Sequence, residues 1–215
     1  MEPMSWDGRE LLRHLDVTVV SNNQFLCSYE EFTSWVEGRK NLTMEAFYRW
    51  QRRRLDVMMD GDDPVGGRWN FDRDNREPPP KDGRAWPALR RFDLDAVDQD
   101  VLERLPTTWG EPPAGIWPVT REQALARLDD FIDDGLEPFG PHEDAMLAAE
   151  WKLAHSTLSS SLNLGLLHPE EVVQRAEAAY REGRADQQRR GVHSPGHGLA
   201  GIRVGRLLGV DAHLP

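Results

Sequence analysis

The stretch that decides the fold runs from His142 to Pro169 and reads HEDAMLAAEWKLAHSTLSSSLNLGLLHP. Its first half is long enough for a helix and carries the apolar residues Met146, Trp151 and Leu153. Its second half is a hydroxyl-dense turn, HSTLSSSLN, which leads into another apolar run. Hydroxyls and free backbone N–H groups near the start of a helix can bind a phosphate, and the helix dipole adds attraction. The pattern therefore predicts either a phosphate site or a serine-rich helix start that packs on its neighbours.

Helical periodicity is the main signal in the rest of the chain. Amphipathic helices are predicted at residues 5–16, 29–37, 44–58, 94–105, 121–134 and 169–182. Two of them have clear start signals, since Thr120 opens a capping-box pattern with Gln123 and Pro169 occupies a first helical position. Gly135 and Gly183 predict the ends of these two helices.

Three further apolar features indicate parts of a core. The run from Val17 to Val20 is rich in β-branched residues and suits a buried strand. Leu158 and Leu162 are four residues apart and would bury one face of the helix at the hydroxyl-dense turn. Trp151 is predicted to be a core aromatic on the same face as Met146.

A long polar loop and a linker separate the two helical parts of the sequence. Residues 60–80 contain glycines and a run of prolines, which exclude a continuous helix or a central strand. Residues 81–118 are rich in proline and acidic residues and predict an extended linker. The loop does not fit a calcium site, because the pattern counted from Asp72 has Glu77 where glycine is required and Gly83 where glutamate is required. No metal site is predicted.

The composition is that of a polar, acidic globular protein. With a net charge of −11 at pH 7, indiscriminate binding to nucleic acid is not expected. The arginines at positions 49 and 52–54 predict a solvated helix face. Cys27 is the only cysteine, which excludes intrachain disulfides and cysteine-based zinc or iron–sulfur sites. The sequence has neither a membrane-spanning stretch nor a signal peptide at its start, so a cytoplasmic location is expected.

The hydroxyl-dense turn resembles a segment of photolyases and cryptochromes of the form (T/S/H)-S-x-L-S-x-x-L-x-x-G-x-(L/I)-x-P. In that family its first half binds the diphosphate and ribityl region of FAD. The residues that would bind the cofactor here are His155, Ser156, Thr157, Leu158, Ser159 and Leu162. A second block, from Met44 to Pro78, is similar to the segment between the two domains of the bacterial iron–sulfur branch of the family. The resemblance covers most of residues 17–185.

The resemblance implies a mostly α fold, namely an incomplete photolyase/cryptochrome fold. Residues 1–60 would be the remnant of an N-terminal α/β antenna-type domain whose earlier strands precede Met1. Residues 61–118 would form the interdomain loop and linker, and residues 119–185 the start of the helical FAD-binding domain.

The function implied by the resemblance is light-driven repair of damaged DNA. Reduced FAD passes an electron to a pyrimidine lesion that has been flipped out of the duplex. Trp69, Asn70, Asn75 and Arg76 would lie in a DNA-facing loop, although Trp69 could equally pin the loop to the protein. The chain lacks the four cysteines of the iron–sulfur cluster and the helices that enclose the isoalloxazine. Weak or no FAD retention and no repair are therefore expected. The alternatives are a fragment of a cryptochrome-like blue-light receptor or a non-catalytic helical interaction module.

The last segment, residues 186–215, differs in character from the rest of the chain. It is rich in glycine, shows no clear helical stripe and predicts a disordered tail. Back-translation with a shift of one base can spell a sequence similar to the next segment of the family. The tail is therefore interpreted as an out-of-frame translation of a truncated gene.

Overall fold

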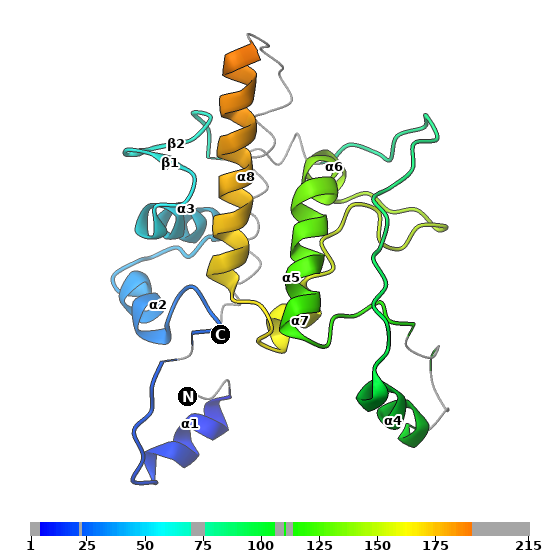
Figure 1. The fold of residues 1–215 in the computed structure, drawn as a ribbon. Coiled ribbons are helices and arrows are strands. Elements are labelled where there is room, and N and C mark those ends of the chain that lie inside the picture. The colour runs from blue at the N-terminus through cyan, green and yellow to red at the C-terminus, as the bar shows by residue number, and fades with distance from the viewer. Residues whose placement is uncertain (1–4, 22, 70–75, 106–109, 111–113, 191–215) are drawn as a thin grey trace.

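The computed structural model describes residues 5–21, 23–69, 76–105, 110 and 114–190, and helices dominate them (Figure 1). In chain order the helices are α1 (Trp6–Arg13), α2 (Tyr29–Val36), α3 (Met44–Leu55), α4 (Ala96–Arg104), α5 (Arg121–Asp130), the π-helix η2 (Phe131–Gly135), α6 (Leu136–His142), α7 (Ser159–Asn163) and α8 (Pro169–Arg190). Strands β1 (Met59–Asp60) and β2 (Asp63–Pro64) pair in an antiparallel hairpin. The prediction of a mostly α protein is confirmed. Within the described part of the chain, no helix has both the length and the apolar character needed to cross a membrane.

Several helices begin where the sequence places a capping side chain. The Ser28 hydroxyl accepts a hydrogen bond from the backbone N–H of Glu31 (3.1 Å), and the Glu31 carboxylate accepts one from the backbone N–H of Ser28 (2.8 Å). Thr120 caps α5 in the same way, through the N–H of Gln123. The Gln123 side chain, however, accepts from the N–H of Val119, so the predicted capping box at Thr120 is only half formed.

The core lies between α8 and the continuous helical segment α5–η2–α6, which stand side by side in Figure 1. Leu128 and Phe131 from this segment pack with Val172 and Ala176 from α8, and all four are at least 96% buried. Each fully buried large apolar side chain of this kind contributes roughly 1.5–3 kcal/mol. The residue directly before β1, Met58, is fully buried in the same core.

Two helices continue through the glycines that were predicted to end them. Gly135 is buried against the Phe131 ring and has a right-handed φ of −90°, so the chain passes through η2 into α6. Helix α8 likewise runs past Gly183 to Arg190. A glycine ends a helix only when it adopts the left-handed conformation, and neither residue does so. The first five residues of the predicted disordered tail are thus helical, and residues 191–215 lie outside the described residues.

The predicted strand at Val17–Val20 is wrong. These residues are irregular, and Val17, Val19 and Val20 are 52%, 45% and 57% exposed. A strand requires a partner for its backbone hydrogen bonds. Among the described residues no strand lies beside this run.

The first half of the stretch that begins at His142, which is long enough for a helix, is not helical beyond His142. This segment consists of turns with one isolated bridge between Leu147 and Glu150. Trp151 is 62% exposed and packs on Trp117 with a ring separation of 6.2 Å, so it is not a core aromatic. The alanine-rich sequence has good helix propensity, and tertiary contacts override it.

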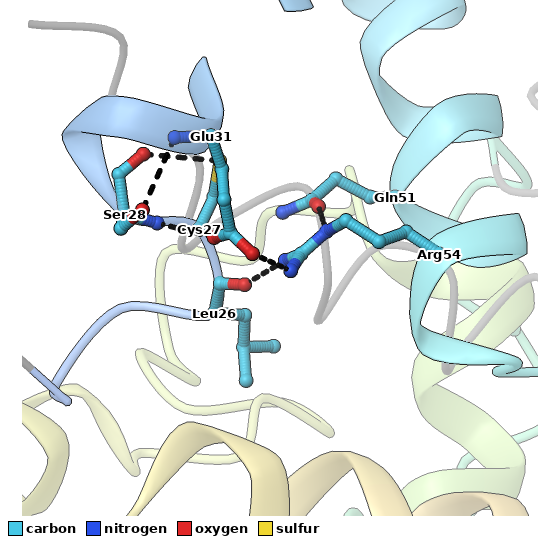
Figure 2. Close-up of polar contacts among 6 residues, drawn as sticks. All are labelled: Leu26, Cys27, Ser28, Glu31, Gln51 and Arg54. Atoms are coloured by element: carbon cyan, nitrogen blue, oxygen red, sulfur yellow. Dashed lines mark hydrogen bonds and ion pairs between the residues drawn. The ribbon is translucent and has the colours of Figure 1, made fainter. Parts of the chain in front are cut away.

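The arginines of α3 do not all face solvent, which corrects the expectation of a solvated basic face. Arg52 is fully buried and donates to the carbonyl of Val57 (3.2 Å). Figure 2 shows the Arg54 guanidinium reaching from α3 to Glu31 (2.5 Å), to Gln51 (2.8 Å) and to the carbonyl of Leu26. Arg54 thereby links α3 to the segment that leads into α2.

Candidate functional site

The six residues predicted to bind FAD occupy a turn and the short helix α7, next to α5 and η2. Leu158 is 1% exposed, and both Leu158 and Leu162 pack into the core. His155, Ser156 and Thr157 are half-buried, whereas Ser159 is exposed. The structure therefore buries the two leucines, leaves His155, Ser156 and Thr157 half-buried in the turn, and exposes Ser159.

The turn owes its shape to local hydrogen bonds rather than to a long helix. The Thr157 hydroxyl donates to the carbonyl of Ser156 (2.6 Å), and the Ser156 hydroxyl accepts from the N–H of Leu158 (3.4 Å). Thr157 has a φ of 55°, an uncommon conformation for a β-branched residue. Helix α7 has five residues and no side-chain cap, so the expected contribution of a helix dipole to phosphate binding is not supported.

A small cavity opens beside His155 and Ser156. The volume open to the centre of a water molecule inside it is about 10 Å³, which is enough for roughly one water. The residues that line it are Ala88, Arg127, Asp130, Phe131, Lys152, His155 and Ser156. Two cations and a histidine thus surround a space that admits a single small group.

Arg127, on α5, holds the linker and the turn together. Its Nη2 donates to the carbonyls of Arg90 (2.7 Å) and Ile116 (2.8 Å), and its Nη1 donates to the hydroxyl of Thr157 (3.4 Å). The residue is 2% exposed, and its buried Nε has no hydrogen-bond partner in the part of the chain that the structure describes. Burial lowers the pKa of the guanidinium, because the charged form is poorly solvated.

Lys152 adds a second cation, which is half-buried. Its Nζ donates to the carbonyl of Pro87 (3.1 Å), and burial together with the nearby charge of Arg127 lowers its pKa. The pKa of His155 is lowered as well, first by burial and then by the charge of Lys152. Asp130 is the one carboxylate that lines the cavity, and both of its oxygens accept hydrogen bonds from Arg90 (2.7 and 2.5 Å).

Arg127 and Lys152 were not predicted as site residues from the sequence. A signal for Arg127 was present, because it lies in register with Ala124, Leu128 and Phe131 on the buried face of its helical segment. A charged residue in a buried stripe is rare unless it is paired or functional. No comparable signal marks Lys152, because its position depends on the non-helical path of residues 143–154.

The predicted DNA-facing loop is only partly described. The ring of Trp69 lies beneath three arginines of α3, with guanidinium-to-ring distances of 4.5 Å for Arg53, 5.2 Å for Arg52 and 5.5 Å for Arg49. These contacts attach the start of the loop to α3. The Arg76 side chain is 67% exposed and lies 3.5 Å from Asp144. Asn70 and Asn75 lie outside the described residues.

Comparison with known proteins shows which family this chain resembles. Residues 1–114 match the family described as deoxyribodipyrimidine photo-lyase-related protein. The chain is 42% identical over 199 residues to a (6-4) photolyase from Agrobacterium fabrum, an alignment that covers 86% of this chain and 38% of that protein. A shorter stretch of 49 residues is 35% identical to an uncharacterised protein of Acanthamoeba polyphaga mimivirus and covers 22% of this chain and 25% of that protein. The chain thus spans well under two thirds of the length of either relative. Because the family match extends over more than half of its residues, this chain belongs to the deoxyribodipyrimidine photo-lyase-related protein family.

Proposed function

We propose that this chain carries the phosphate-binding side of an FAD site in a photolyase-type protein that repairs damaged DNA under blue light. The observation that carries the proposal is that His155 and Ser156 line one cavity together with Arg127 and Lys152, beside Thr157, whose hydroxyl accepts a hydrogen bond from Arg127. Hydroxyl and cationic donors are the groups that proteins use to bind phosphate.

The residues present fit the phosphate portion of the cofactor. Among the described residues, the Nε of Arg127 on α5 and the buried hydroxyls of Ser160 and Ser161 on α7 have no hydrogen-bond partner. Such unsatisfied groups are uncommon in folded proteins and point to a missing acceptor or donor. The cavity is far smaller than the roughly 300–1,000 Å³ of a typical cofactor site, so the isoalloxazine ring requires other enclosing segments.

Bound FAD would supply light absorption and an electron for the lesion, while the residues of this chain bind and orient its phosphates. His155, held neutral by burial and by Lys152, would act as a hydrogen-bonding group rather than as a third cation. Without the enclosing segments we expect weak flavin retention and no repair by this chain alone. Damaged DNA is the proposed partner of the whole protein, and the exposed Arg76 is a candidate contact to it.

Equilibrium dialysis of the full chain against FAD tests the proposal. We expect weak, saturable binding that Ser156→Ala weakens about fivefold, since one hydrogen bond of roughly 1 kcal/mol is lost. Ser34→Ala, at an exposed serine of α2, is the matched control and should leave the affinity unchanged. A folded chain that takes up no FAD would overturn the proposal and favour a non-catalytic helical module.

A further inference from the structure

We propose that Arg127 and Lys152, which lie outside the motif shared with photolyases, form an oxyanion site together with His155. The site would accept one oxygen of a phosphate or diphosphate group. This inference rests on the proposed function and deepens it, because it assigns the positive charge that the hydroxyl-dense turn itself lacks.

The charge balance around the cavity is the first observation. Arg127 and Lys152 both line it, and among the described residues neither forms an ion pair with a carboxylate. Asp130 could neutralise them, but its carboxylate is already held in a two-point interaction by Arg90. A buried and a half-buried cation near one another raise the free energy of the folded state unless an anion compensates them.

Hydrogen bonding is the second, independent observation. The buried Nε of Arg127 has no partner in the described structure, although the other two nitrogens of the guanidinium are bonded. A guanidinium normally satisfies its donors, and phosphate oxygens are among its preferred acceptors. A water-sized space beside this group is suited to a single oxygen of an anion that otherwise lies outside the cavity.

A purely structural role does not explain both cations. The bonds from Arg127 to Arg90 and Ile116 and from Lys152 to Pro87 fasten the linker, but neutral donors could make them. The Phe92 ring, 5.5 Å from the Arg127 guanidinium, and the nearby carboxylates of Asp130 and Asp134 offset part of these charges, but among the described residues no ion pair completes the compensation. Charge compensation by an anion gives both of them a role.

Pyrophosphate binding to the full chain tests the inference without FAD. Isothermal titration should show saturable binding that Lys152→Gln weakens at least tenfold, because the glutamine keeps a donor for Pro87 but loses the charge. Lys81→Gln, at an exposed lysine of the linker, should bind pyrophosphate like the unmodified chain. Thermal melting distinguishes an anion-binding role of Lys152 from a role that only holds the linker in place. Without anion, Lys152→Gln should melt at or above the temperature of the unmodified chain, yet gain no stability from pyrophosphate.

The outcomes separate this inference from the proposed function. Absent pyrophosphate binding, or equal binding by Lys152→Gln, would overturn the oxyanion site, even if FAD binds and depends on Ser156. If the chain binds pyrophosphate through Lys152 but does not bind FAD, the result supports the oxyanion site and overturns the proposed function.

Discussion

The guanidinium of Arg127 and the hydroxyl of Thr157 lie 3.4 Å apart, although 30 residues separate them in the chain. This hydrogen bond joins the buried face of α5 to the hydroxyl-dense turn. Thr157 holds a left-handed backbone conformation at that point, with a φ of 55°. The contact thus stabilises a conformation that threonine rarely adopts by itself, and both partners belong to the proposed phosphate site.

Substitution of Thr157 should separate backbone strain from hydrogen bonding. Thr157→Asn should be within about 0.5 kcal/mol of the unmodified chain, because asparagine tolerates the left-handed region and keeps an acceptor for Arg127. Thr157→Val should be destabilised by about 1 kcal/mol or more, because it retains the strained branching and loses both hydrogen bonds of the hydroxyl. Urea unfolding of the two variants measures the difference. Equal stabilities would contradict this account of the turn.

Gly115 should tolerate no side chain. It has a φ of 67°, and a Cβ there would collide with the carbonyl oxygen of Phe92, whose N–H donates to the Gly115 carbonyl (2.8 Å). Gly115→Ala should therefore lower the free energy of unfolding by more than about 2 kcal/mol, through both backbone strain and steric displacement of the linker.

Gly83 offers a matched comparison for that substitution. It has a similar φ of 73° but open space where a Cβ would stand. Gly83→Ala should cost only the conformational strain of about 1–2 kcal/mol. If the two variants lose the same stability in urea unfolding, the contact between Gly115 and Phe92 has no energetic importance.

Arg54 should matter more to stability than any surface arginine. Its guanidinium is largely buried and bonds Glu31, Gln51 and the Leu26 carbonyl (Figure 2). Arg54→Gln should lower the free energy of unfolding by about 1.5–3 kcal/mol, the range for hydrogen bonds to charged groups. Arg104→Gln, in an exposed pair on α4, should change it by no more than about 0.5 kcal/mol. Chemical denaturation followed by circular dichroism measures both effects, and equal effects of the two substitutions would disprove this role of Arg54.

The ion pair between Arg121 and Glu171 should make stability depend on acid pH. Hydrogen bonds from Arg121 (2.7 and 2.8 Å) lower the pKa of Glu171 below its usual value of 4.5. A carboxylate with a lowered folded-state pKa stabilises the fold above its unfolded pKa, and this contribution is lost as the pH falls through the folded value. Partial exposure of both side chains keeps the effect below about 1 kcal/mol.

Thermal unfolding between pH 6 and pH 2 checks this expectation. Glu171→Gln should have a lower melting temperature than the unmodified chain at pH 6, and the gap should close as the pH falls below about 4.5. Glu170→Gln, one residue earlier on α8, is the control because its carboxylate bonds the neutral side chain of Gln174 (3.0 Å). A constant gap for Glu171→Gln across this pH range would rule out the proposed linkage.

Local sequence signals predicted helix starts well and helix ends poorly. Thr43 and Thr120, both predictable as caps, and Ser28, which was not predicted as one, each cap a helix because a hydroxyl can satisfy a free backbone N–H within three residues, an interaction that needs no distant partner. Gly135 and Gly183 failed as end signals because their backbone conformation is set by packing and by helix continuation. A local motif predicts structure only where local atoms determine it.

The sequence by itself determined the family, the mostly α fold and the hydroxyl-dense turn, because each is encoded in a continuous run of residues. Tertiary structure alone decided that residues 143–154 are not helical, that Arg52 and Arg127 are buried, and that Lys152 joins His155 at one cavity. These features depend on contacts between residues far apart in the chain, such as Lys152 with Pro87 and Arg127 with Arg90. Burial and charge at the site arise from such long-range contacts, which no local pattern records.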